Sequence, residues 1–226
     1  MSQARKISLT TADGHTLAAF VAQPDQMVKG GIVILQEVFG ITGHMQALVE
    51  QYAGLGYLAI VPALFDRAAP NTVVPYSNPD AGRLLATESN ERELLLDIDT
   101  AISYLKGSVD EVVVSGYCWG GSLAYLTACE LDVQAAVSYY GTRTVSYLSK
   151  RPKCPVQFHF GGLDELVSSD VIEQTRKALP DEEYYIYPEA GHGFNCTERA
   201  SFDPLASDLA LTRVLGFFAK NLKKTV

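Results

Sequence analysis

Short apolar runs alternate with helical patterns along most of the 226 residues of the chain. The first two runs, residues 6–9 and 16–21, flank the dipeptide Asp13-Gly14. This dipeptide favours a tight hairpin turn because glycine adopts positive φ at little cost. The pattern therefore predicts that the first two strands form an antiparallel hairpin.

Six later runs are apolar and β-rich, and they predict strands at residues 31–36, 57–61, 111–115, 135–139, 156–160 and 183–187. Helical patterns separate these runs, which is typical of βαβ units. The run Ile32-Val33-Ile34-Leu35 is apolar on both faces, as in a parallel sheet that helices cover on both sides. We therefore expect an α/β fold with a mostly parallel central sheet, helices on both faces and the antiparallel hairpin at the N-terminus.

Hydrophobic spacing predicts the helices between the strands. One predicted helix carries apolar residues at intervals of four, four and three on a single face: Leu94, Ile98, Ile102 and Leu105. It should end near Lys106-Gly107. Similar patterns predict further helices at residues 44–55, 119–129, 168–179 and 204–221.

Residues 62–79 contain four prolines and little periodicity, so we expect a long loop over the carboxyl edge of the sheet. No internal repeat or interdomain linker is visible in the sequence. A single domain is therefore predicted over residues 1–226.

Composition narrows the class of protein. Hydrophobic residues make up 47% of the chain and charged residues 19%, which excludes a disordered chain. The formal net charge is -8, so the chain lacks the excess of basic residues that nucleic-acid binding requires. No apolar run approaches the roughly 18 residues of a membrane span, and the first eight residues are not followed by the apolar stretch of a signal peptide. We expect a cytoplasmic protein without nucleic-acid or membrane partners.

The four cysteines form no Cys-x-x-Cys pair, so the sequence predicts neither a zinc site nor a thioredoxin-type motif. Cys129, Cys154 and Cys196 are expected to be free thiols that fill space as small hydrophobic residues. Cys118 differs because it lies in Gly116-Tyr117-Cys118-Trp119-Gly120-Gly121, where a predicted strand runs into a predicted helix.

This spacing is that of the nucleophile elbow of α/β-hydrolases, with cysteine in place of serine. Small residues are needed on both sides of the nucleophile, because larger side chains would collide with the strand or the helix. At a helix N-terminus, free N–H groups and the helix dipole favour a thiolate over a thiol. The alternative interpretation is a glycine-rich turn with an incidental buried cysteine.

Such a nucleophile needs an acid and a histidine, which follow it in that order in this fold. Asp164 lies just past the strand at residues 156–160, and His192 lies just past the strand at residues 183–187. Because the carboxyl ends of parallel strands meet at one edge, Cys118, Asp164 and His192 are predicted to converge as a catalytic triad. Glu165 is a second candidate for the acid, and Asp164 could instead cap a turn or a helix. The alternative for His192 is a histidine on a surface loop without a catalytic role.

Glu37 directly follows the apolar run that begins at Ile32. A carboxylate in this position is expected to be half buried, and burial costs several kcal/mol unless the group is paired or protonated. Two interpretations stay open. Glu37 is either the partner of a backbone N–H or an arginine, or a proton acceptor beside Cys118.

Several segments together resemble the dienelactone hydrolases (carboxymethylenebutenolidases): Gln36-Glu37-Val38-Phe39-Gly40, Gly116-Tyr117-Cys118-Trp119-Gly120-Gly121, Ser138-Tyr139-Tyr140-Gly141, Gly161-Gly162-Leu163-Asp164 and Ala190-Gly191-His192-Gly193-Phe194. The resemblance runs nearly from end to end. It implies an α/β-hydrolase fold and a cytoplasmic monomer that opens a lactone ring through an acyl-thioester. It also implies that no metal or organic cofactor is needed.

The resemblance implies roles for individual residues as well. Cys118, Asp164 and His192 match the family's triad, and the glutamate that matches Glu37 accepts the thiol proton when substrate arrives. The backbone N–H groups of Val38 and Trp119 match the oxyanion hole. In this chemistry the thiolate attacks the lactone carbonyl, and the histidine then activates the water that hydrolyses the thioester.

The family's best-described members hold a substrate carboxylate with two arginines. Arg83 is the nearest match to the first of them, whereas Cys196 stands at about the place of the second, with Arg199 three residues later. Both arginines could equally be solvated surface residues. Tyr140, at the end of a predicted strand, is a candidate for the pocket wall, and simple packing is its alternative.

The sequence therefore predicts a cysteine-dependent carboxylic ester hydrolase that acts on a small lactone or an activated ester. An alternative is a catalytically weak protein of the same fold that uses Cys118 as a redox-sensing thiol or its pocket as a binding module. A general serine-type esterase or peptidase is disfavoured, because the nucleophile is a cysteine and no large insertion forms a second domain.

Overall fold

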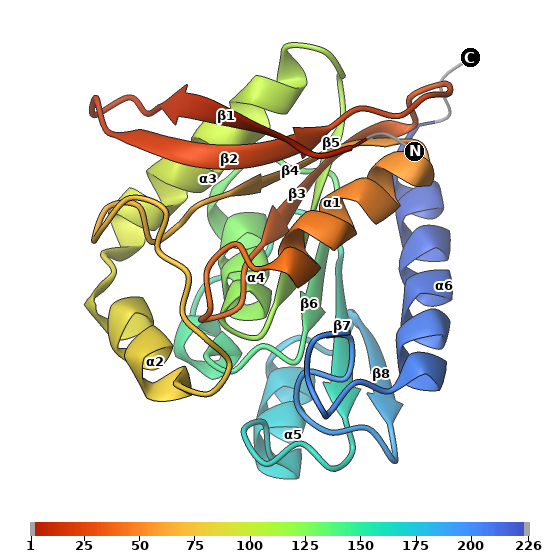
Figure 1. The fold of residues 1–226 in the computed structure, drawn as a ribbon. Coiled ribbons are helices and arrows are strands. Elements are labelled where there is room, and N and C mark those ends of the chain that lie inside the picture. The colour runs from red at the N-terminus through yellow and green to blue at the C-terminus, as the bar shows by residue number, and fades with distance from the viewer. Residues whose placement is uncertain (1–2, 224–226) are drawn as a thin grey trace.

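The computed structural model describes residues 3–223, so residues 1–2 and 224–226 of the predicted domain lie outside it. Eight strands form one sheet in the order β1-β2-β4-β3-β5-β6-β7-β8 (Figure 1). Strands β1 (Arg5–Thr10) and β2 (Thr16–Ala22) pair antiparallel across the Asp13-Gly14 turn. The predicted hairpin at the N-terminus is therefore confirmed.

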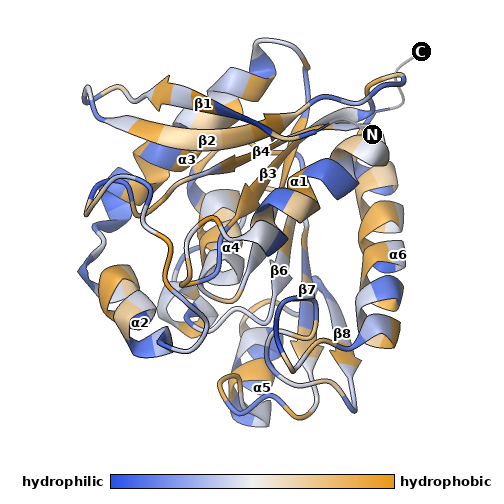
Figure 2. Ribbon diagram, viewed as in Figure 1, coloured by the Kyte–Doolittle hydropathy of each residue, from blue (hydrophilic) through white to orange (hydrophobic). Residues whose placement is uncertain are grey.

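The remaining strands are β3 (Gly30–Leu35), β4 (Tyr57–Pro62), β5 (Val112–Tyr117), β6 (Ala136–Tyr139), β7 (Val156–Gly161) and β8 (Glu183–Tyr187). They run parallel to one another, and β2 joins β4 antiparallel. Every residue of β3 to β7 is buried, as expected for strands that are covered on both faces. Figure 2 shows the central strands coloured mainly as hydrophobic.

Helices cover both faces of the sheet, as predicted. One face packs against α3 (Glu91–Lys106), α4 (Trp119–Glu130) and α5 (Ser169–Ala178), and the other against α1 (Gly43–Gly54) and α6 (Pro204–Asn221). The helix α3 ends before Gly107, where its apolar periodicity stops. None of the helices within residues 3–223 has the length and apolar character that a membrane crossing requires.

The sequence pattern did not predict α2 (Pro79–Glu88) or the short 3-10 helix η1 (Thr144–Tyr147). The side chain of Asn78 caps α2, and Pro79 opens it, which is a favourable place for proline. Its inner face is a short stripe at helical spacing that Ala81, Gly82, Leu85 and Ala86 form, and sequence reasoning missed it. The predicted loop at residues 62–79 is confirmed and occupies residues 63–78, because β4 takes up Pro62 and α2 begins at Pro79.

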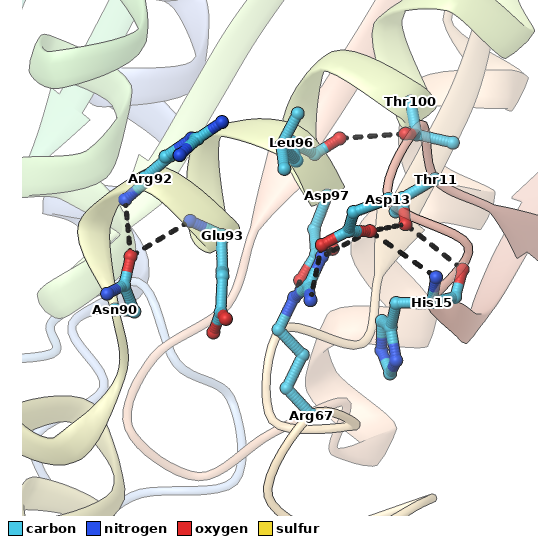
Figure 3. Close-up of polar contacts among 10 residues, drawn as sticks. All are labelled: Thr11, Asp13, His15, Arg67, Asn90, Arg92, Glu93, Leu96, Asp97 and Thr100. Atoms are coloured by element: carbon cyan, nitrogen blue, oxygen red, sulfur yellow. Dashed lines mark hydrogen bonds and ion pairs between the residues drawn. The ribbon is translucent and has the colours of Figure 1, made fainter.

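A cluster of charged side chains ties the hairpin turn to α3 (Figure 3). The Arg67 guanidinium contacts the Asp97 carboxylate at 2.8 to 3.1 Å and Asp13 Oδ2 at 3.0 Å. Asp97 is fully buried, and burial raises the pKa of its carboxyl although Arg67 opposes the rise. Hydrogen bonds from Arg67 and Thr11 hold the pKa of Asp13 well below its usual range. Arg67 thus joins segments that are far apart in the sequence.

Replacing Arg67 by methionine should lower the free energy of unfolding by about 3 kcal/mol, because the buried Asp97 carboxylate then loses its cation. Arg83→Met is the matched control, since Arg83 and Asp80 form an exposed pair whose contribution is at most about 1 kcal/mol. Urea unfolding of the two variants measures the difference. Equal losses would contradict the assigned importance of the Asp97 pair.

Candidate active site

Cys118 lies at the turn between β5 and α4, with φ 55° and ψ -116°. A non-glycine residue in such a conformation costs on the order of 1–3 kcal/mol, so the surrounding structure must hold it there. A Cβ on Gly116 would overlap the carbonyl of Gly120, and a Cβ on Gly120 would overlap the carbonyl of Leu35. The structure therefore has the sharp strand-to-helix turn that the glycine spacing predicts.

Cys118, His192 and Asp164 are in contact. The Nε2 atom of His192 lies 3.1 Å from Cys118 Sγ, and its Nδ1 atom lies 2.8 Å from Asp164 Oδ2. The other oxygen of Asp164 accepts hydrogen bonds from two backbone N–H groups, those of Leu166 and Val167, which fix the carboxylate. The competing acid in the sequence, Glu165, is exposed to solvent. The predicted convergence of three distant loops thus holds in the structure.

The charge state of His192 is set by its two partners. Burial disfavours the imidazolium, but Cys118 and Asp164 outweigh burial and raise the pKa of His192 to about 10. A histidine whose pKa is raised by folding stabilises the folded state fully below its ordinary pKa of about 6.5, and this contribution is lost as the pH rises through 10. Nε2 of His192 is also placed where it could accept the thiol proton of Cys118, and that transfer stays a prediction.

Cys118 and His192 line a cavity of about 380 Å³, a volume within the usual range for small-molecule sites. The cavity brings together six of the predicted site residues: Val38, Arg83, Cys118, Trp119, His192 and Arg199. The indole ring of Trp119 stacks on Phe65 with ring centroids 5.1 Å apart, which holds the residue after Cys118 in place.

Tyr140 is fully buried, and its ring meets His192 at a centroid distance of 4.9 Å and Phe194 at 5.3 Å. The tyrosine therefore packs against the histidine and supports its position. A direct contact between Tyr140 and substrate stays a prediction.

Glu37 is buried more deeply than predicted, with 1% of its surface exposed. The expectation of a half-buried carboxylate was wrong, because the segment that follows β3 is itself covered by the rest of the fold. One carboxylate oxygen lies 3.5 Å from Nη1 of Arg199, and the other has no hydrogen-bond partner among the described residues. Burial raises the pKa of Glu37, while Arg199, His192 and Cys196 act against the rise. Glu37 thus has an arginine partner, and its role in proton transfer stays a prediction.

The two predicted arginines differ in their surroundings. Arg199 is mostly buried beside Glu37, and its guanidinium also lies 5.6 Å from the ring centroid of Phe39. Arg83 stands on α2 with half of its side chain exposed, and it pairs with Asp80 at 2.7 Å. Both line the cavity, so each is placed to meet a ligand.

Sequence reasoning missed a third arginine. Arg143 lines the same cavity, and it donates hydrogen bonds to the carbonyl of Ala86 at 3.0 Å and to Thr87 Oγ1 at 2.6 Å. It thereby ties the chain after β6 to α2. The sequence does contain a signal that could have indicated Arg143: it stands two residues after Gly141, at the carboxyl end of a strand, where active sites of such sheets gather. Cys196, which was expected only to fill space, also donates to the Tyr76 hydroxyl at 3.4 Å.

Solved structures share the arrangement of this sheet and its helices. A Klebsiella pneumoniae protein classed among the dienelactone hydrolases superposes with a TM-score of 0.83 and 27% identity, over 96% of this chain and 99% of that chain. An esterase of Pyrococcus furiosus has a TM-score of 0.72 and 15% identity, over 98% of this chain and 93% of that chain. The fold is therefore that of the α/β-hydrolases, as predicted.

The sequence comparisons define the family within this fold. A carboxymethylenebutenolidase of Pseudomonas putida is 36% identical over 225 residues, which cover 94% of this chain and 95% of the relative. A carboxymethylenebutenolidase of Pseudomonas knackmussii gives the same values. The model of the dienelactone hydrolase family matches residues 17–222, and the chain belongs to that family. The predicted enzyme class, a carboxylic ester hydrolase, is confirmed.

Replacing His192 by asparagine should slow the alkylation of Cys118 by iodoacetamide at pH 7 at least about tenfold, because the thiol loses its proton acceptor. Cys154 is an internal control, since burial raises the pKa of its thiol to about 12 and it should react slowly in both proteins. Peptide mass spectrometry follows both cysteines. Equal alkylation of Cys118 with and without His192 would exclude proton transfer to the histidine.

Proposed function

We propose that this chain opens a small enol lactone, or cleaves a small activated ester, through an acyl-thioester on Cys118. The observation that carries the proposal is the line of contacts from Asp164 through His192 to Cys118, beside a cavity that three arginines line. A base that is oriented by an acid and contacts a nucleophile is the arrangement that acyl transfer needs. Membership of the dienelactone hydrolase family supports this class of substrate.

In the first proposed step, the sulfur of Cys118 attacks the carbonyl carbon, and the electron pair of the C=O bond moves to oxygen. Backbone N–H groups of Val38 and Trp119 then stabilise the oxyanion, and losing one such donor typically costs about 3–4 kcal/mol. Collapse of the intermediate breaks the bond to the ring oxygen. An enolate leaves at least as readily as a thiolate, which favours enol lactones over ordinary esters.

In the second step, His192 acts as the base. It has given its proton to the departing oxygen, so its Nε2 atom can accept a proton from the water that attacks the thioester. Asp164 keeps the Nδ1 side of the ring occupied and fixes the orientation of Nε2 toward the reacting atoms. The collapse that follows releases the carboxylic acid and returns the thiolate to the pair with His192.

The contact between Glu37 and Arg199 offers a link between substrate binding and proton transfer. A substrate carboxylate that binds Arg199 would compete with Glu37 for its cation. The buried carboxylate of Glu37 would then hold a proton more strongly, because burial without a cation favours the neutral form. Glu37 would in this way be a second acceptor for the thiol proton, beside His192, when an anionic substrate is present.

Replacing Cys118 by alanine should lower the hydrolysis of 4-nitrophenyl acetate and of an enol lactone at least about 1,000-fold, because the acyl acceptor is removed. Cys154→Ala is the matched control, since this partly exposed thiol does not line the cavity. Initial rates at several substrate concentrations measure the effect. Turnover that survives in Cys118→Ala would overturn the proposed mechanism.

Replacing Arg83 by alanine should raise KM for a lactone that carries a carboxylate about 10- to 100-fold, because a charge-assisted hydrogen bond is lost. A neutral lactone with the same ring should keep its KM. Asp80→Asn is the matched control, since it removes the partner of Arg83 and leaves the guanidinium in place. Equal losses on the charged and the neutral lactone would defeat the assigned recognition of a carboxylate by Arg83.

A further inference from the structure

A second cavity, of about 340 Å³, lies between α1 and α6. The segment after His192 contributes to both cavities: His192 and Arg199 line the first, whereas Asn195 and Thr197 line the second. Among the described residues, the two cavities share no lining side chain. The second cavity is therefore separate from the candidate active site, although one segment borders both.

The floor of this cavity is aromatic and deeply buried. Tyr52, Tyr117, Tyr139 and His44 line it, and each has at most 2% of its surface exposed. The rings of Tyr117 and Tyr139 stack at a centroid distance of 4.7 Å and an interplanar angle of 20°. The rim carries exposed residues of both helices, among them Gln51 and Asp208. The two faces of the Tyr139 ring are covered by Tyr117 and His159, so a ring that enters from solvent would meet the edges of these aromatic side chains.

A polar atom on the floor lacks a partner. His44 contacts Thr197 Oγ1 at 3.3 Å through Nδ1, whereas its Nε2 atom is buried and makes no hydrogen bond among the described residues. An unpaired buried polar group destabilises a protein by about 1–3 kcal/mol, so a group that pairs with Nε2 is favoured here. A hydroxyl group suits either tautomer of the ring, because it both donates and accepts hydrogen bonds.

The charges of the two cavities differ. The described lining of the second cavity includes neither lysine nor arginine, and its one carboxylate is Asp208. Burial lowers the pKa of His44 to about 4, so its ring is neutral at pH 7. The first cavity, by contrast, is lined by Arg83, Arg143 and Arg199. An anion is thus favoured in the first cavity and disfavoured in the second.

We propose that the second cavity binds a small neutral aromatic molecule that carries a hydroxyl group, with the ring against Tyr117 and Tyr139 and the hydroxyl on His44. The volume is at the low end of known ligand pockets, which limits the occupant to about one or two rings. The site is independent of the proposed reaction, because none of its lining residues takes part in it.

The test uses the full chain after iodoacetamide has alkylated Cys118, which places a carbamidomethyl group in the first cavity, and binding in the second cavity is assigned by the His44 variant. We expect 4-methylphenol to bind saturably in a calorimetric titration, and 4-methylbenzoate, which has the same ring with a negative charge, to displace it at least tenfold more weakly. His44→Phe should weaken the binding of 4-methylphenol at least tenfold. His15→Phe, the same substitution outside the cavity, should leave its affinity unchanged within twofold.

Three outcomes would overturn the proposal. The first is the absence of saturable binding, which would mean that the cavity holds water only. The others are equal affinity of the site for the phenol and the benzoate, and unchanged affinity for the phenol in His44→Phe. If His44→Phe does not fold, the ring ¹⁵N resonances of His44 in the unaltered chain decide. They should shift on addition of 4-methylphenol, and resonances that stay fixed at saturation would overturn the proposal.

Discussion

The first turn of α4 presses so closely against β3 and β5 that there is no room for a Cβ on Gly116 or Gly120. Because these backbones touch, the residue between them must turn sharply, and Cys118 takes up the positive φ that the turn requires. Its sulfur is thereby presented at the carboxyl edge of the sheet. The parallel strands β7 and β8 end at this same edge and deliver Asp164 and His192 to it. The geometry of the site thus depends on a steric contact between backbones.

Close contact between backbones also positions the wall of the first cavity. A Cβ on Gly82 would overlap the carbonyl of Val38, so α2 lies directly against the segment that carries one of the proposed oxyanion donors. Arg143 also holds α2, one turn further along the helix, through Ala86 and Thr87. The position of Arg83 on α2 therefore depends on contacts made elsewhere on the helix. In a chain with a net charge of -8, these local contacts, and not the overall field, gather positive charge around Cys118.

Much of the fold and the central contacts of the site could be predicted from the sequence, because they follow from local patterns. Apolar strands, the Asp13-Gly14 turn and the glycines around Cys118 each indicate their own conformation. The burial of Glu37 and the contacts of Arg143 could not be predicted in this way. Both depend on contacts with segments that are distant in the sequence. Hydrophobic periodicity indicates only the type of an element and which of its faces is buried, not which residues pack against it. The pairing of Arg199 with Glu37 likewise could not be predicted, because it depends on how the loop after His192 folds back against Glu37.

The position of His192 also depends on aromatic packing that reaches beyond the candidate active site. Its ring rests on Tyr140, which contacts Phe194, and Phe194 in turn contacts Tyr139 on the floor of the second cavity. Since Tyr139 stacks on the buried ring of His159, this series of rings is anchored in the sheet. His159 is itself hydrogen-bonded through both ring nitrogens, to Tyr187 and Gln157, as a structural histidine should be. A molecule in the second cavity would therefore rest on the same packed rings that hold His192 in place, without touching the side chains of Cys118 and His192.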